Sequence, residues 1–294
     1  MRCRNNPRRA AAAALLLALW PALPAAQSLT LPRRDGSVRF LVLGDAGTGD
    51  RAQYQVGDQI ARYHRVFPFR FAILLGDNLY GAERPQDYAR KFELPYKALL
   101  DAKVEFHAAL GNHDDPNQRF YKPFSLGGAR YRSFTAGPVT FYVIDSNYLD
   151  PKQVAWLEEE LKKPRTPWRI AYFHHPLYTT ARRGPEVELR MILEPLFVKY
   201  GVDVVFQGHE HVYERLVPQK GVFYFTAGGS AKLRSGDVRS GDLIEVGYAR
   251  DRTFMLVEVT GNSLFFQTVN RRGDTVDRGM IARQLRPGDD RPVR

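Results

Sequence analysis

The sequence predicts an α/β fold in which a mostly parallel β-sheet packs against a second, mixed sheet. Three observations lead to this class. Apolar, β-branched runs recur along the chain, segments with helical spacing lie between them, and the second half adds strands without helices. At 294 residues, 44% hydrophobic and 26% charged, the chain is long enough for one large domain with a substantial core.

Five buried strands are expected, and each ends in polar residues: 38–45, 71–77, 105–114, 168–175 and 202–211. Helices are expected between the first two strands and at 151–163 and 184–201. The spacing between successive strand ends is long enough for one strand-helix-strand unit, so these strands should run parallel. Later runs alternate and should pair as hairpins in the second sheet. The segments 81–100 and 230–250 are expected to be loops that shape specificity.

We expect residues 1–28 to be a secretory signal peptide, because arginines precede an apolar run that small residues follow. The run is too short to span a bilayer, and cleavage is expected between Ala25 and Ser28. The protein should therefore be secreted or periplasmic, with twin-arginine export as a second route. Residues 36–272 are the expected folded domain, and 283–294 an expected mobile tail.

The composition limits which metals, substrates and macromolecules the protein is expected to bind. The only cysteine, Cys3, lies in the expected signal peptide, so any metal site in the exported chain must use oxygen and nitrogen ligands. Loss of that peptide removes four arginines and lowers the formal net charge from +11 to +7. A basic surface attracts anionic substrates such as phosphate esters, and it also suits solubility. No nucleic-acid-binding surface is evident, no membrane span is expected after loss of the signal peptide, and the sequence does not indicate the oligomeric state.

Short polar motifs follow all five expected strands: GDAG, GDNLY, GNHD, HHP and GHEH. Ligand sites in open α/β sheets form beyond the carboxyl ends of strands, so the five motifs should meet in one crevice. Most of the histidines belong to these motifs, and only His64 and His107 do not. These two are expected to be structural, one on a helix and one in a strand.

Carboxylate, amide, imidazole and phenol groups without thiolate are typical ligands of Fe, Mn and Zn. Several anionic ligands together indicate more than one ion. A pair of metal ions can clamp the attacking and leaving oxygens of a phosphoryl displacement. Asp77, in the middle of the series, is the natural bridging carboxylate.

The five motifs, in this order, resemble the signature of calcineurin-like metallophosphoesterases, and more narrowly of purple acid phosphatases. Many members of the wider family have a metal-binding histidine two residues after the first aspartate, where this chain has Gly47. In purple acid phosphatases a tyrosine from the second motif replaces this histidine as a metal ligand, and Tyr80 of GDNLY matches that tyrosine. The resemblance implies the four-layer α/β/β/α fold, two sheets packed as a sandwich and flanked by helices, with 36–272 as the catalytic domain.

The resemblance also implies a ligand set for two ions. The first, expected to be Fe(III), would be bound by Asp45, Asp77, Tyr80 and His211. The second, a divalent Fe, Zn or Mn ion, would be bound by Asp77, Asn112, His174 and His209. His113 resembles the family's substrate-side histidine, which contacts phosphate or protonates the leaving group. His175 is either a neighbour that contacts substrate or a packed residue.

Arg183 stands where the small mammalian-like enzymes have a histidine facing the substrate. A guanidinium cannot give up a proton at working pH, but it can bind a phosphate oxygen. Arg183 is therefore expected either to bind substrate phosphate or to be a solvent-exposed loop residue. Glu214 and Arg215 are expected to form a structural ion pair.

The resulting hypothesis is an exported dinuclear-metal acid phosphatase that hydrolyses phosphomonoesters by attack of metal-bound hydroxide. A phosphodiesterase or nucleotidase with the same metals is the alternative within enzymes. A periplasmic metal- or phosphate-binding protein without turnover is the alternative from another class. Turnover of a chromogenic phosphomonoester beside a diester would separate the three.

Overall fold

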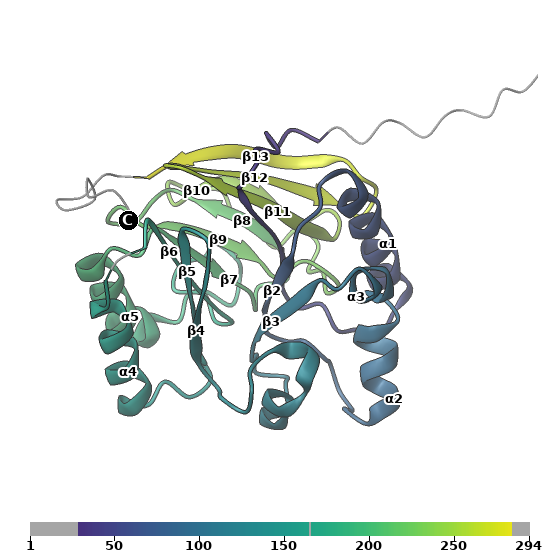
Figure 1. Cartoon of the computed structure of the whole chain (residues 1–294), viewed down its shortest axis with the longest axis horizontal. Helices are drawn as coiled ribbons and strands as arrows, with labels where there is room; N and C mark the ends of the chain where they lie inside the picture. The colour runs from purple at the N-terminus through teal and green to yellow at the C-terminus, as the bar shows by residue number, and fades with distance from the viewer. Residues whose placement is uncertain (1–28, 165, 284–294) are drawn as a thin grey trace, which may run out of the picture.

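Two β-sheets pack face to face in the computed structural model, which describes residues 29–164 and 166–283 (Figure 1). The expected signal peptide and nearly all of the expected tail lie outside the described residues. Helices α1–α3 lie on one side of the sandwich and α4 and α5 on the other (Figure 1). The predicted sandwich of two mixed sheets flanked by helices is confirmed.

The six-stranded sheet has the order β13-β12-β11-β1-β2-β3. Its strands β1 (Val38–Leu43), β2 (Phe71–Leu75) and β3 (Glu105–Ala109) are parallel neighbours. An antiparallel group completes it: β11 (Thr253–Thr260), β12 (Ser263–Asn270) and β13 (Thr275–Ala282). The sheet therefore continues past residue 272, where the sequence prediction ended the domain, because β13 pairs with β12 along its length.

The seven-stranded sheet has the order β10-β8-β9-β7-β6-β5-β4. Its parallel strands are β5 (Val139–Val143), β6 (Trp168–Phe173), β7 (Val204–Gln207) and β9 (Phe223–Ala227). The antiparallel strands are β4 (Arg132–Ala136), β8 (Tyr213–Leu216) and β10 (Ile244–Tyr248). The five motif-bearing strands are thus divided between the two sheets, whereas the sequence analysis placed them in one mostly parallel sheet.

Local signals explain the helix ends. Asp50 accepts a hydrogen bond from the backbone N–H of Gln53 at the start of α1 (Arg51–Val66), and Asp150 does the same for α4 (Pro151–Lys162). The third long helix, α5 (Val187–Tyr200), ends at Gly201, whose φ of 74° lies in the left-handed region that glycine adopts most readily. It begins three residues later than expected, because 184–186 still form the connection from β6.

Two further expectations were wrong. Residues 85–101 are mostly helical rather than a loop, with α2 (Pro85–Tyr88), a π-helical turn at 89–93 and α3 (Lys97–Asp101). Glu214 and Arg215 do not pair, because neighbours in a strand point to opposite faces. Glu214 accepts hydrogen bonds from the hydroxyls of Thr179 and Thr180, whereas Arg215 binds Asp277.

Aromatic side chains join the two sheets. The Phe40 ring on β1 lies 5.2 Å from Phe141 on β5 and 6.2 Å from Phe206 on β7, edge to face in both cases. All three are fully buried. This apolar layer sets the separation of the sheets and therefore the separation of the strand ends described below. Within the described residues, no helix combines the length and apolar character that a membrane crossing requires.

Candidate metal centre

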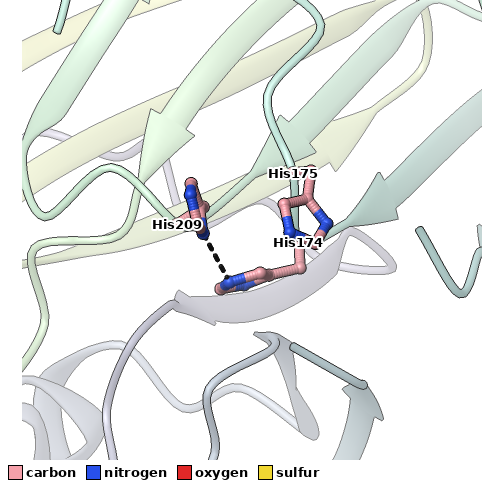
Figure 2. A group of neighbouring side chains, drawn as sticks. All are labelled: His174, His175 and His209. Carbon is pink, nitrogen blue, oxygen red and sulfur yellow. Dashed lines mark hydrogen bonds between the residues drawn. The ribbon is translucent and has the colours of Figure 1, made fainter. Parts of the chain in front are cut away.

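The five motifs converge where the carboxyl ends of the parallel strands of both sheets meet. Figure 2 shows part of this meeting point: His174 and His175 follow β6, and His209 follows β7. The facing sheet contributes residues that follow β1, β2 and β3. The structure therefore brings the predicted ligands together, although from two sheets instead of one.

One cluster surrounds the phenol of Tyr80. Its hydroxyl lies 2.9 Å from Oδ1 of Asp45 and 3.2 Å from Nε2 of His211. His211 Nε2 also lies 3.3 Å from Asp45 Oδ1. Atoms of Asp45, Asp77 and His211 approach one another within 4.8 Å, which is close enough for one ion. This group is the ligand set expected for Fe(III).

A second cluster surrounds the side-chain oxygen of Asn112. That Oδ1 lies 2.9 Å from Nε2 of His174 and 2.9 Å from Nδ1 of His209. The two imidazole nitrogens are 3.1 Å apart, as the dashed line in Figure 2 shows. The other ring nitrogen of His174 lies 2.9 Å from the carbonyl oxygen of Leu75, which orients Nε2 toward the cluster.

Asp77 lies between the clusters. Its Oδ1 accepts a hydrogen bond from the backbone N–H of His113 at 2.9 Å and is 3.4 Å from Nε2 of His174. Its Oδ2 is buried and has no hydrogen-bond partner. An orphaned carboxylate oxygen is costly in the interior unless it binds a cation. The donor set and this orphaned atom both fit a pair of metal ions that share Asp77.

The charges of the site favour cations. Burial, reinforced by the carboxylate of Asp77, raises the pKa of Asp45 well above its ordinary range. Burial and the two carboxylates also raise the pKa of Tyr80. Burial, followed by the charge of Arg183, lowers the pKa of His211 to about 4. Burial, followed by the neighbouring His174 and His175, lowers the pKa of His209 to about 2. Cations favour ionised carboxylate and phenolate and need neutral imidazole, so bound metal would offset the carboxylate repulsion.

The backbone at these strand ends is strained. Asp45, Asp77 and His209 have φ values of 54°, 51° and 67°, in the left-handed region that non-glycine residues seldom adopt. Residues kept in this region cost free energy that the surrounding structure must offset. All three are predicted ligands. Four other non-glycine residues with positive φ, Arg33, Lys103, Ser125 and Lys220, are not among the predicted ligands.

The close packing at Gly47 explains why a ligand here comes from the loop that carries Tyr80. A Cβ at residue 47 would lie 1.7 Å from the carbonyl oxygen of Asn78 and 2.6 Å from Cα of Leu79. The close approach also lets the N–H of Tyr80 donate to the carbonyl oxygen of Gly47 at 2.9 Å. No side chain fits at residue 47, so a ligand at this side of the site must come from the facing loop.

The predicted substrate-side residues lie around these clusters. The exposed ring of His113 is centred 5.0 Å from that of Tyr80. Arg183 is exposed, and its Nη1 lies 3.2 Å from Nε2 of His209, so its guanidinium is at the site. The His175 Nδ1 lies 3.0 Å from the hydroxyl of Ser146, and its ring is 4.7 Å from that of His209. His64 and His107, which the sequence analysis expected to be structural, lie in ring contacts elsewhere: His64 contacts Phe69, and His107 contacts Phe134.

Sequence reasoning missed two lysines at Tyr80. The ammonium of Lys232 lies 4.5 Å from the centre of the Tyr80 ring, a cation–π contact. Lys91 is only 3% exposed, and its ammonium donates to the carbonyl oxygens of Tyr80 and Ala82. Both lie in the segments expected to be loops, where no periodic pattern or motif marked them.

A comparison with protein families adds to this geometry. The model of the family described as calcineurin-like phosphoesterase matches residues 38–213. The chain belongs to this family. The match covers all five motifs and confirms the resemblance stated from the sequence.

Two relatives in this family extend the comparison. The chain is 25% identical to purple acid phosphatase 7 of Arabidopsis thaliana, covering 86% of this chain and 88% of that protein. It is 24% identical to tartrate-resistant acid phosphatase type 5 of Homo sapiens, covering 92% and 99%.

Among solved structures, the purple acid phosphatase PPD1 from yellow lupin seeds shares the fold. Its TM-score is 0.69 at 19% identity, over 90% of this chain and 58% of that chain. The protein is thus a purple acid phosphatase-like metallophosphoesterase, and the prediction of a metal-dependent phosphoester hydrolase is confirmed. The roles of the individual residues stay predictions.

Proposed function

We propose that the protein is an exported dinuclear-metal acid phosphatase that hydrolyses phosphomonoesters. The observation that carries this proposal is the position of Asp77. Its Oδ1 lies 3.4 Å from Nε2 of His174 in the Asn112 cluster, and one of its carboxylate oxygens lies within 4.8 Å of ligand atoms of Asp45 and His211. Its Oδ2 has no hydrogen-bond partner. A shared carboxylate is what two adjacent ions require. The phosphatase names of the two relatives support the same reaction.

Fe(III) is the ion proposed for the Tyr80 cluster, and divalent Fe, Zn or Mn for the Asn112 cluster. When bound, the two ions supply positive charge for the phosphate oxygens and lower the pKa of a water molecule. Phenolate and two carboxylates make the first cluster the more anionic one, which suits the more highly charged ion.

The chain's own residues position the ester. The exposed guanidinium of Arg183 can bind a phosphate oxygen through two N–H groups and keeps its charge at any working pH. His113, whose exposed ring is centred 5.0 Å from that of Tyr80, contacts the phosphate or protonates the leaving alcohol. His175 contacts the substrate on the side of Ser146.

Export is part of the proposal. It is supported by the arginine-rich start, apolar run and small residues of 1–28, and by the absence of cysteine after Cys3. The substrates would therefore be small phosphate esters outside the cytoplasm, and the basic net charge would attract them.

Turnover of p-nitrophenyl phosphate and bis(p-nitrophenyl) phosphate by the metal-loaded chain tests the function. We expect the monoester to have the higher kcat/KM. A higher value for the diester would favour a phosphodiesterase. Tight binding of metal and inorganic phosphate with no turnover of either ester would make the protein a binder and overturn the proposal.

A further inference from the structure

A cavity of about 550 Å³ adjoins the metal centre. Asn112 and His175 line it on the side of the centre. The opposite wall comes from the segment after β5 and from the start of α5. A phosphate ester bound at the ions would lie next to this cavity, because Asn112 belongs to both the cavity and the ligand cluster. The cavity is therefore in position to receive the leaving group.

The wall formed by α5 is acidic. Glu186 and Glu188 are exposed, and neither forms an ion pair with any residue in the described part of the chain. Both lie at the N-terminal end of α5, where the helix dipole favours ionised carboxylate. The lining holds two further carboxylates: Asp145 is paired with Arg130 at 3.3 Å, and Asp114 accepts hydrogen bonds from the side-chain amides of Asn78 and Gln118. Glu186 and Glu188 are thus the two negative charges of the wall without an ion-pair partner among the described residues.

The metal centre itself is flanked by basic side chains. Arg183 lies against His209, and Lys232 lies over the ring of Tyr80. These side chains and the acidic wall together form a polarised site, positive near the phosphate and negative at the far wall of the cavity. Such an arrangement favours a substrate whose two ends carry opposite charges and disfavours an anionic leaving group.

Other groups in the lining suit the same ligand. Leu149, Leu189 and Ile192 provide apolar surface for a short carbon chain. Asn147 also lines the cavity, and its buried Oδ1 has no hydrogen-bond partner. Burial closes this oxygen off from the cavity, so it is the three apolar side chains that suit the ligand.

We propose that this cavity binds the alcohol part of the substrate and selects phosphomonoesters whose alcohol carries an ammonium group. The inference rests on the proposed phosphomonoesterase function. In the reaction, a water oxygen bonds to phosphorus and the bond from phosphorus to the alcohol oxygen breaks. The alcohol takes up one proton and leaves as the amino alcohol, and inorganic phosphate is the other product.

Three esters of similar size test the selection: 2-aminoethyl, ethyl and 2-carboxyethyl phosphate. We expect the metal-loaded chain to give the highest kcat/KM with the first and the lowest with the third. An ammonium group also lowers the pKa of the leaving alcohol, so the ratio in the wild type alone does not decide. The deciding quantity is the ratio of kcat/KM for 2-aminoethyl phosphate to kcat/KM for ethyl phosphate. This ratio is compared between the wild type and a variant that lacks the two charges of the wall.

The variant is Glu186→Gln with Glu188→Gln, which keeps the side-chain shape and removes two charges. Glu186 makes no capping hydrogen bond with its side chain, so the helix start should persist. The matched control is Asp101→Asn with Glu159→Gln, the same change of charge at exposed positions on α3 and α4. The wall variant should lower the ratio of kcat/KM for ammonium over neutral ester about five-fold, a typical effect of exposed charge pairs. The control should leave it unchanged.

Equal ratios in the wild type, wall variant and control would overturn the inference, and so would an equal fall in both variants. Phenyl phosphate separates this failure from failure of the proposed function. If phenyl phosphate is hydrolysed while the ratios are equal, only the selection is wrong. If no ester is hydrolysed, the function is wrong, and calorimetric titration with 2-aminoethyl phosphate tests the cavity. Binding of 2-aminoethyl phosphate that weakens in the wall variant alone would support the inference. Binding that is absent from, or equally strong in, the wild type, the wall variant and the control would overturn it.

Discussion

At the scale of single residues, the pairing of Gly47 with Tyr80 defines the character of the site. The chain passes so close to the loop after β2 that only glycine fits at residue 47. The same approach holds the N–H of Tyr80 on the carbonyl oxygen of Gly47 and directs the phenol toward Asp45. A backbone contact thus selects the phenol as the ligand candidate.

The first prediction concerns this phenol. If Tyr80 binds Fe(III) as phenolate, the oxidised protein should have a broad visible charge-transfer band and look purple. Tyr80→Phe should abolish the band and leave the circular dichroism spectrum unchanged, because the ring itself remains. A colourless, fully active protein that contains only Zn or Mn would contradict the Fe(III) assignment but not phosphoester hydrolysis.

The second prediction concerns the glycine. Gly47→Ala should shift the loop that carries Tyr80, because the added Cβ meets backbone atoms rather than a movable side chain. We expect a loss of roughly 1–3 kcal/mol in the free energy of unfolding and a weaker visible band. Gly241→Ala is the control, since a Cβ there meets nothing within 4 Å. Similar unfolding curves and spectra for both variants would show that the contact is not restrictive.

At the scale of elements, the candidate ligands lie at strand ends, and the positions of these strand ends could be predicted from the sequence. Each apolar run gives way abruptly to Gly, Asp, Asn or His, and this change marks both the strand end and the ligand. The division of the strands between two sheets could not be predicted, because strand order depends on pairing between distant segments. β1, for example, pairs with β11 more than 200 positions away.

Residues outside motifs show the same limit. Lys232 and Lys91 reach Tyr80 only through the folding of segments without apolar periodicity. Arg183 was recognised as a candidate by its place in a family pattern, but only the structure puts its guanidinium beside His209. The position of a long side chain in a connecting segment depends on tertiary contacts that local sequence does not encode.

The third prediction concerns β3. His107 is 8% exposed and stacks on Phe134, and burial followed by the charge of Arg132 lowers its pKa from 6.5 to about 4. The unfolded chain takes up this proton near pH 6.5 and the folded chain only near pH 4. The free energy of unfolding should therefore fall as the pH decreases through this window, by up to roughly 3 kcal/mol from this residue.

Urea unfolding of the wild type and His107→Phe at pH 7, 5.5 and 4.5 measures this contribution. Phenylalanine keeps the stacking and removes the titration, so the variant should lose less stability than the wild type between pH 7 and 4.5. Parallel losses in the two proteins would mean that His107 takes up its proton at the same pH in the folded and the unfolded chain, which contradicts the lowered pKa.

At the scale of the whole molecule, the site joins the two sheets. Asp45, Asp77 and Asn112 follow strands of one sheet, whereas His174, His209 and His211 follow strands of the other. Ions bound between them would connect the sheets and stabilise the folded state by linkage. Removal of metal with a chelator should therefore lower Tm, and this drop should be absent in a chain that cannot bind the ions.

The number of metal ions per chain, measured by elemental analysis together with phosphomonoester turnover, tests the dinuclear centre most directly. We predict two ions and full activity in the wild type and in His64→Ala, because His64 lies on α1 away from the strand ends. Asp77→Asn should bind fewer ions and lose most activity, since one carboxylate serves both. Equal metal content and activity in all three proteins would contradict the account.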